Sequence, residues 1–301
     1  MAADLNGVLP VVPTPFLDSG ELDLRSLANL IDFAVDAGAS ALVYPGVASE
    51  DVHLTPAERA ACLQTAVRQN RGRLPIVAGV NSKTAQGMVD AAEQAAASGA
   101  DMIMAMAIPD MGADYVNWFK RISAATEGRP IILQNLFAPR GADLSAQEML
   151  NLAEAIPAIH YVKEEGIPSG VKVSALVAAV GGSLKGVIGG GGARYVFEEL
   201  ERGAVATMPA IELLELHVGL LNAYFEHRRD HALELYTKSL PLLLIQAPYR
   251  MRMTKHILKH KGLIKSDFVR EPLPEMDDQL KHLVLELYEA TSAIRETSLA
   301  S

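Results

Sequence analysis

Eight short apolar segments recur along the chain, and seven of them are separated from the next by an amphipathic stretch. Near-continuous apolar runs rich in Val, Ile, Leu and Met suit strands that are buried on both faces of a parallel sheet. The expected strands are 7–12, 41–44, 75–80, 102–107, 131–134, 159–163, 184–188 and 204–208. Eight strand and helix units are the number that closes a (β/α)8 barrel.

Helix signals support this spacing. Thr55-Pro56-Ala57-Glu58 forms a capping box with proline at the first helical position, and Ser145-Ala146-Gln147-Glu148 forms a second capping box. The pair Gly-Ala recurs at Gly38, Gly99 and Gly203, each time just before an expected strand. We interpret this recurrence as a repeated corner between a helix and the next strand.

The pattern changes after the eighth segment, because from about residue 211 only helical periodicity remains. Helices are expected at 231–240, 249–261 and 276–295, interrupted by Pro241, Pro272 and Pro274. The sequence therefore predicts an α/β fold, a (β/α)8 TIM barrel with a C-terminal helical extension. The expected division is a barrel over 1–226 and a helical appendage over 227–301.

Length, charge and cysteine content narrow the class of protein. A chain of 301 residues is long enough for one barrel and a small extension. Its net charge is −9 and no stretch concentrates Lys and Arg, which argues against a nucleic-acid partner. Cys62 is the single cysteine, and neither a basic, apolar leader nor an apolar run of membrane-spanning length occurs. We expect a cytoplasmic protein that has no membrane partner.

The sixth expected strand carries the residues with the clearest chemical potential. Alternation along a strand places Lys163 and Glu165 on one side and Glu164 on the other. An amine at the mouth of a barrel is a candidate Schiff-base nucleophile once its lone pair is free. The alternative is that the strand ends early and all three side chains lie in solvent.

Other candidate residues follow the remaining strands, where a barrel places its chemistry. The turn Val47-Ala48-Ser49 could receive a carboxylate on its amides, or could be an ordinary tight corner. Gln134 could hold a substrate oxygen, although amide side chains there are more often structural. Gly189 and Gly190 begin a run of four glycines that could let a ligand approach the backbone, or could be a flexible corner.

A metal site is not expected. His227 and His231, and likewise His256 and His260, have helical four-residue spacing, but both pairs lie among basic residues and lack the Glu of a zinc protease motif. We interpret them as solvated helix faces. The Met-rich strand 102–106 is interpreted as barrel core, not as a cofactor site.

The ordered set of motifs resembles the dihydrodipicolinate synthase and N-acetylneuraminate lyase family of class I aldolases and dehydratases. The resemblance covers nearly the whole chain. It rests on segment 7–16, a Gly-x-x-x-Glu turn at 46–50, Tyr161-Val162-Lys163-Glu164 for the Schiff-base strand, 203–205, and 255–262. It implies that Lys163 forms an imine with a small 2-oxo acid, that no metal or organic cofactor is needed, and that the protein is a homodimer or homotetramer.

Departures from the family pattern indicate one branch of it. Synthase members have Gly-Thr-Thr-Gly-Glu in the turn, a proton-shuttling tyrosine after strand five and a second tyrosine after strand four. In this chain the turn at 46–50 reads Gly-Val-Ala-Ser-Glu, and Gln134 stands in the place of the proton-shuttling tyrosine. The segment after strand four, 108–111, reads Ile-Pro-Asp-Met and has no tyrosine. Glutamine does not titrate near neutral pH and cannot shuttle a proton. An arginine, Arg140, follows strand five, but the loop there differs in length by one residue from that of family members whose arginine binds the substrate.

This chain resembles the 2-keto-3-deoxy sugar acid dehydratases, which act on compounds such as 2-keto-3-deoxyarabonate. The shared features are Ser-Glu in the turn, glutamine in the place of the tyrosine, and an acidic residue two positions beyond the lysine. The resemblance implies that Glu165 moves the proton, that Val47, Ala48 and Ser49 hold the substrate carboxylate, and that Gln134 orients hydroxyl groups. A pyruvate-dependent aldolase on the same imine and a catalytically silent 2-oxo-acid-binding barrel are the alternatives.

Overall fold

A computed structural model of the protein describes residues 4–291. Along this part of the chain, eight strands alternate with eight helices, and two further helices follow. The strands are β1 (Gly7–Val8), β2 (Leu42–Val43), β3 (Ile76–Gly79), β4 (Met102–Met106), β5 (Ile131–Asn135), β6 (Ile159–Glu164), β7 (Gly186–Gly189) and β8 (Ala206–Thr207). The helices are α1 (Leu24–Asp36), α2 (Pro56–Asn70), α3 (Ala85–Ala97), α4 (Tyr115–Ala125), α5 (Ala146–Ala155), α6 (Gly170–Val177), α7 (Val196–Glu201), α8 (Leu214–Phe225), α9 (Arg229–His260) and α10 (Asp278–Glu289). Each expected strand overlaps an observed one, so the order of elements is that of the predicted (β/α)8 plan.

The chain forms two compact units. The first unit, 1–6 and 75–208, contains β3 to β8 and α3 to α7. The second unit, 7–74 and 209–301, contains β1, β2, α1, α2 and the C-terminal helices. The predicted boundary between 226 and 227 differs from this division and stays a prediction.

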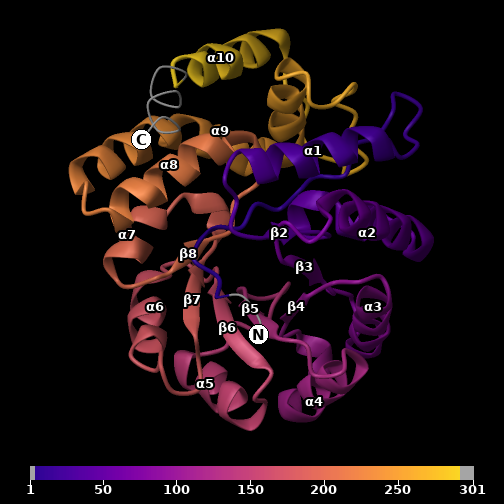
Figure 1. Ribbon diagram of the computed structural model, residues 1–301, viewed down its shortest axis with the longest axis vertical. Helices are drawn as coiled ribbons and strands as arrows, with labels where there is room; N and C mark the ends of the chain where they lie inside the picture. The colour runs from indigo at the N-terminus through magenta and orange to yellow at the C-terminus, as the bar shows by residue number, and fades with distance from the viewer. Residues whose placement is uncertain (1–3, 292–301) are drawn as a thin grey trace. The chain divides into compact units, whose positions relative to one another are not determined.

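The first unit is a parallel sheet with its helices outside it. Strands β3 to β8 are neighbours in chain order, and helices α3 to α7 surround them in Figure 1. All five residues of β4 are buried, so the Met-rich strand belongs to the core, as interpreted from the sequence. Burial on both faces explains why these strands are apolar almost throughout.

The register of the first sheet aligns the residues that matter for chemistry. Gln134 on β5 pairs with Lys163 on β6, and Lys163 pairs with Ile188 on β7. Since all these strands are parallel, their C-terminal ends lie at the same end of the sheet, which forms one edge across the strands. The polar residues that follow β3, β5, β6 and β7 are therefore gathered at that edge.

The repeated Gly-Ala corner is present at all three places. Gly38, Gly99 and Gly203 have φ of 83°, 94° and 94°. In each corner the glycine amide donates to the carbonyl oxygen three residues before it, and the alanine amide donates to the carbonyl oxygen five residues before it. Glycine adopts this left-handed conformation without a Cβ penalty, so the helix ends and the chain turns into the strand.

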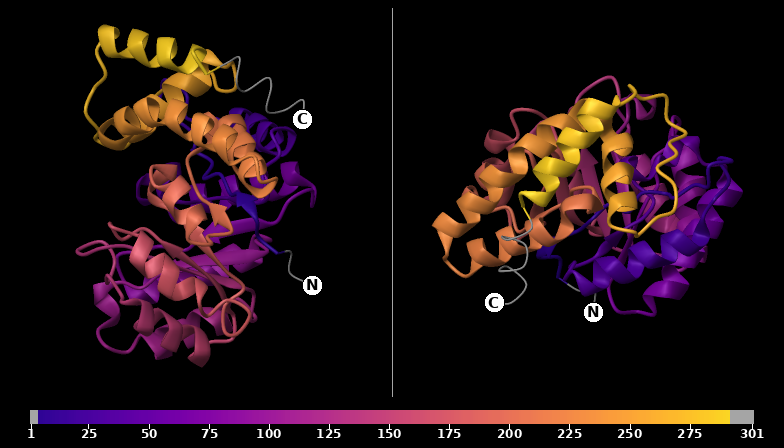
Figure 2. Two further views of the ribbon diagram at one scale, coloured as in Figure 1. Left: turned by 90° about the vertical axis from the view of Figure 1, so that its left-hand side faces the viewer. Right: turned by 90° about the horizontal axis from the view of Figure 1, so that it is seen from above.

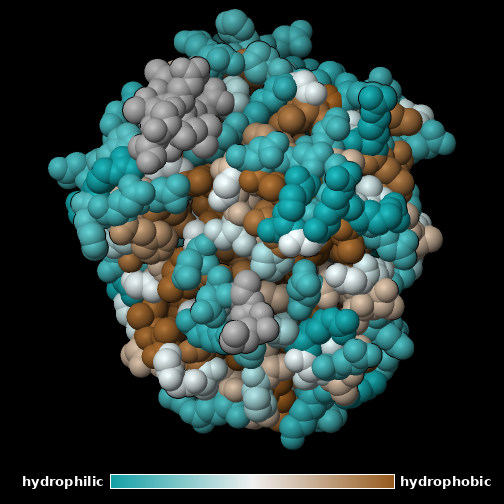
Figure 3. Space-filling view, viewed as in Figure 1, coloured by the Kyte–Doolittle hydropathy of each residue, from teal (hydrophilic) through white to brown (hydrophobic). Residues whose placement is uncertain are grey.

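The second unit contains the C-terminal helices. Figure 2 shows α8, α9 and α10, coloured orange to yellow, packed beside one another. Helix α10 buries Val284 and Tyr288, and the residues at the upper edge of Figure 3, which belong to α10, are mostly hydrophilic. An amphipathic helix of this kind is held by its apolar face.

Helix ends agree with the sequence at the capping boxes but not everywhere. Both predicted boxes form, at Thr55 before α2 and at Ser145 before α5. The predicted interruption at Pro241 is wrong, because α9 continues through Pro241 and departs from helical geometry at Arg250 instead. Proline removes one backbone hydrogen bond, which a long helix can tolerate when its other turns are packed.

Two further helix boundaries lie near the glycine run and near the C-terminus. Helix α7 begins at Val196, because a short 3-10 turn, η4 (Gly191–Ala193), comes first. Helix α10 ends at Glu289, and residues 292–295 of the expected helix lie outside the described residues.

Replacing Gly203 with Ala tests the corner. A Cβ at this position would lie 2.9 Å from Cγ1 of Val177, whereas Gly181, with a similar φ of 91°, has open space around it. We expect Gly203→Ala to lower the free energy of unfolding by about 2–5 kcal/mol, since backbone strain and a clash add. Gly181→Ala, the control, should lose about 1–2 kcal/mol from strain alone. Equal losses in urea unfolding of the two variants would contradict this account of the corner.

Candidate active site

Lys163 lies near the end of β6 and is almost completely buried, at 4% exposed. Its Nζ is 3.2 Å from Oε2 of Glu165. The two side chains thus lie on the same side of the strand, as alternation predicts. A buried amine and carboxylate at this distance can exchange a proton directly.

The Glu165 carboxylate is held by three groups. Besides Lys163, Gln134 Nε2 donates to Oε2 at 2.5 Å and the Gly191 amide donates to Oε1 at 3.3 Å. Burial alone would raise the pKa of Glu165, but Lys163, Gln134 and the Gly191 amide together hold it below its usual value. Glu165 is therefore an oriented carboxylate at neutral pH.

Asn81 is a residue of this site that the sequence analysis missed. It follows β3, and its Nδ2 donates to Oε1 of Gln134 at 3.1 Å, which fixes the orientation of the Gln134 amide. Its own Oδ1 is buried without a hydrogen-bond partner. A single asparagine after a strand carries no distinctive local signal, so only the fold reveals its position.

Glu164 faces the other way and has a structural role. Its Oε2 accepts from Asn135 Nδ2 at 2.8 Å and its Oε1 accepts from the Gly166 amide at 2.5 Å. Burial raises the pKa of Glu164, and these hydrogen bonds partly offset the effect. Asn135 also makes two hydrogen bonds with the backbone of Leu144, so this pair fixes the loops after β5 and β6.

Gly189 ends β7 and Gly190 follows it, and each of the two glycines lies against an acidic side chain. A Cβ on Gly190 would lie 2.1 Å from Cγ of Glu165, and a Cβ on Gly189 would lie 2.0 Å from Oε2 of Glu199. Glycine is thus required here by the approach of two acidic side chains. Substrate binding by these two residues remains a prediction.

The remaining predicted site residues lie in the second unit or in an exposed loop. Val47, Ala48 and Ser49 form the 3-10 turn η1 (Val47–Ser49), whose first amides have no partner within the turn. The Ser49 hydroxyl donates to the Val12 carbonyl at 2.5 Å and accepts from the Gly46 amide at 3.0 Å. Their role as carboxylate ligands stays a prediction. Arg140 is exposed in the loop after β5.

Glu50 follows this turn and anchors it. The residue has a φ of 57°, and its carboxylate accepts from Lys255 Nζ at 2.5 Å and from the amides of Arg270 and Glu271 at 2.7 and 2.8 Å. Lys255 and Glu50 have fully buried side chains. The motif glutamate therefore holds the turn to the C-terminal segment of the second unit.

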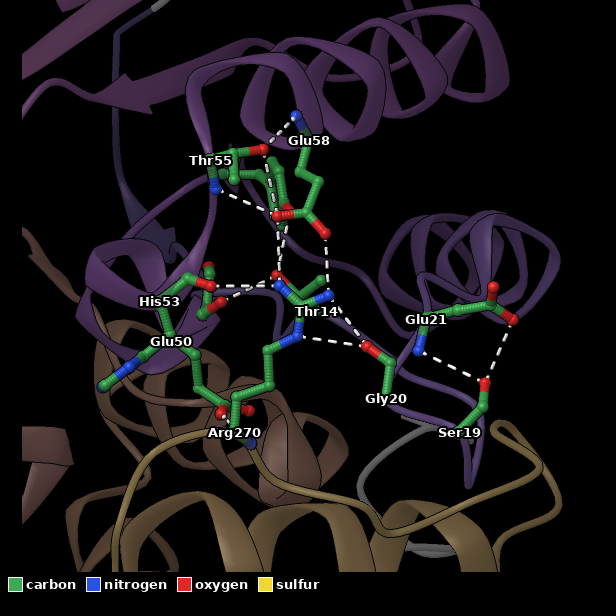
Figure 4. A network of polar contacts seen from close by, with 11 residues as sticks. Thr14, Ser19, Gly20, Glu21, Glu50, His53, Thr55, Glu58 and Arg270 are labelled. Atoms are coloured by element: carbon green, nitrogen blue, oxygen red, sulfur yellow. Dashed lines mark hydrogen bonds and ion pairs between the residues drawn. The ribbon is translucent and has the colours of Figure 1, made fainter.

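Arg270 links the same network to helix α2, as Figure 4 shows. Its guanidinium makes a bidentate pair with Glu58 at 2.7 and 3.0 Å and also donates to the carbonyl oxygens of Gly20 and His53. The hydrogen bonds from Arg270 lower the pKa of Glu58 to about 2. These residues form a network of ion pairs and charge-assisted hydrogen bonds with a structural role.

Residues 4–291 contain neither a cluster of metal ligands nor a helix that could span a membrane. No three His, Cys, Asp or Glu side chains in that part of the chain gather as metal ligands would. Among the same residues, no helix is both long and apolar enough to cross a lipid bilayer.

Comparisons with known proteins place the chain among lyases of one family. Residues 4–291 match the model of the dihydrodipicolinate synthetase family. The chain is 31% identical to L-2-keto-3-deoxyarabonate dehydratase from Azospirillum brasilense, over 90% of this chain and 89% of that protein.

Solved structures have the same fold. Dihydrodipicolinate synthase from Rhodopseudomonas palustris matches with a TM-score of 0.87 at 23% identity, over 95% of this chain and 97% of that one. YagE of E. coli K12, a protein of the dihydrodipicolinic acid synthase family solved in complex with pyruvate, matches with a TM-score of 0.85 at 24% identity, over 96% and 99%. The predicted fold class, a (β/α)8 barrel with a C-terminal helical extension, is confirmed.

The buried pair in the second unit gives a stability prediction. Glu50→Gln should lower the free energy of unfolding by about 3–5 kcal/mol, because it leaves the Lys255 ammonium without a carboxylate. Glu50→Gln combined with Lys255→Met should recover part of this loss. Asp32→Asn, which breaks the half-exposed pair with Arg73, serves as the control and should cost less than about 1 kcal/mol. A double variant less stable than Glu50→Gln in urea would contradict the assignment.

Proposed function

Because the chain belongs to the dihydrodipicolinate synthetase family of Schiff-base lyases, we propose that it dehydrates a 2-keto-3-deoxy sugar acid through an imine on Lys163. The observation that carries the proposal is the buried Lys163–Glu165 pair, at 3.2 Å, with Gln134 rather than a hydroxyl group bound to the acid. In this arrangement Glu165 is the group that can move protons.

The first half of the proposed reaction forms the imine. Glu165 takes a proton from the Lys163 ammonium, and the free amine attacks the C2 carbonyl carbon of the substrate. The carbonyl oxygen leaves as water with one proton from the amine and the proton that Glu165 returns, which gives a protonated imine and restores the carboxylate.

The second half removes water from the sugar chain. Glu165 takes a proton from C3, and the electron pair moves into the imine to give an enamine. The enamine then expels the C4 hydroxyl, which leaves as water with the proton that Glu165 returns. Hydrolysis of the resulting unsaturated imine releases the product and restores Lys163.

Gln134 positions the acid throughout this sequence. Its amide donates to Oε2 of Glu165 while Asn81 holds its oxygen, so the amide plane cannot turn freely. The second N–H of Gln134 and the unpartnered Oδ1 of Asn81 are suited to substrate hydroxyl groups. The Azospirillum relative, named for a 2-keto-3-deoxy acid, supports this substrate class. The proposal includes a cytoplasmic homodimer or homotetramer without a metal or organic cofactor.

Trapping of the imine tests the nucleophile. Incubation with pyruvate and borohydride should add one reduced pyruvate to Lys163 in intact and peptide mass spectra, and Lys163→Arg should give no adduct because guanidinium cannot form the imine. The absence of an adduct on the unaltered protein would reject both the dehydratase and an aldolase. Turnover of 2-keto-3-deoxy acids then separates these two, since a dehydratase retains the carbon chain and an aldolase releases pyruvate and an aldehyde.

Glu165→Gln tests the acid. Turnover should fall by about 10²–10⁴-fold, because the amide cannot carry a proton, while the pyruvate adduct still forms, but more slowly, since water must then deprotonate Lys163 in place of Glu165. Glu154→Gln, an exposed change on α5, is the control and should retain full activity. Near-normal turnover of Glu165→Gln with normal adduct formation would remove Glu165 from the mechanism.

A further inference from the structure

A second acidic side chain, Glu199, lies buried on the other side of β7 from Glu165. It belongs to α7, is 1% exposed, and its Oε1 accepts from the Ser169 hydroxyl at 2.9 Å. Its Oε2 is buried with no hydrogen-bond partner. A charged carboxylate with an unsatisfied oxygen is costly in such surroundings, so the neutral acid is the favoured form.

The glycines at the end of β7 separate Glu199 from Glu165 by the backbone of one strand. Gly189 lies against Oε2 of Glu199 and Gly190 lies against Cγ of Glu165, so the two acidic side chains contact consecutive residues from opposite sides of the strand. A side chain at either position would displace one of them. The charge of one acid is thus felt by the other.

The surroundings separate the two acids in proton affinity. Burial raises the pKa of Glu199 to about 7, Glu165 and Glu198 add to the effect, and the hydroxyl of Ser169 partly offsets it. Glu165, in contrast, has a pKa below its usual value because Lys163 is beside it. Two acids whose proton affinities are driven apart in this way are typical of acid and base partners in active sites.

Other charged groups near Glu199 are already paired. On α7 itself, Glu198 is 3.0 Å from Arg202. On α6, which packs against α7, Lys172 is 2.7 Å from Asp143. Glu165 is therefore the charged group of the proposed site that responds to the state of Glu199.

We infer that Glu199 is a positioning residue that acts through Glu165 across the backbone of β7: neutral Glu199 leaves the negative charge of Glu165 alone to balance Lys163, and ionised Glu199 adds a second buried negative charge on the opposite side of the strand. The inference rests on the proposed imine chemistry. Both activation of Lys163 and formation of the enamine discharge a cation, from ammonium to amine and from iminium to enamine. A second buried anion stabilises the cations and therefore slows both steps.

Glu199→Gln is the direct test, because the amide keeps the shape of the acid but never ionises. The measurement is the ratio of kcat/KM of the unaltered protein to that of Glu199→Gln between pH 5.5 and 8.5, which cancels the pH effects common to both proteins. The ratio should fall on the order of tenfold through about pH 7, as a single ionisation. The control, Glu154→Gln, alters an exposed acid on α5 and should leave the ratio to the unaltered protein constant with pH.

Ser169→Ala gives a second test that does not depend on Glu199→Gln folding. It removes the hydroxyl that lowers the pKa of Glu199, so the midpoint of the pH transition should move upward. A flat ratio for Glu199→Gln, or an unmoved midpoint in Ser169→Ala, would overturn the inference.

The rate of pyruvate adduct formation under borohydride, measured over the same pH range, separates the inference from the proposed function. If no 2-keto-3-deoxy acid is turned over but the adduct ratio still falls near pH 7, the substrate proposal fails and the role of Glu199 stands. If turnover is found and neither ratio changes with pH, the proposed function stands and the inference fails.

Discussion

The parallel register of β5, β6 and β7 is the constraint on which the first unit depends. With Gln134 aligned to Lys163, and Lys163 to Ile188, a shift of one residue would turn Lys163 to the opposite face and bring Glu164 into its place. The apolar residues of each strand would be reversed by the same shift. The core packing that fixes the register of the strands therefore also fixes the position of the Lys163 amine.

Two buried lysine and glutamate pairs show how surroundings decide between structure and chemistry. Lys255 and Glu50 are both fully buried, and the carboxylate is saturated by backbone amides. Lys163 and Glu165 retain 5% and 15% exposure, and one oxygen of Glu165 has a single long hydrogen bond. The first pair is locked by its donors, whereas the second can exchange its proton and admit a substrate.

The parts of this arrangement that depend on period and local chemistry could be predicted from the sequence. Apolar runs located the strands, capping boxes located two helix starts, and alternation placed Lys163 and Glu165 together. Asn81 and Glu199 could not be found, because they approach the site only through the tertiary fold and carry no local signature. The helix end expected at Pro241 does not occur, because the packing of α9 outweighs the local helix-breaking preference of proline.

The network around Glu50 also sets an order of events during synthesis. The three groups that donate to the Glu50 carboxylate lie 205 to 221 residues further along the chain. A ribosome must therefore translate most of the protein before the charge of Glu50 can be compensated as it is in the native state. Residues 75–208, by contrast, emerge as one continuous stretch that holds six of the strands. The sheet that carries Lys163 can assemble while the other unit still waits for its C-terminal half.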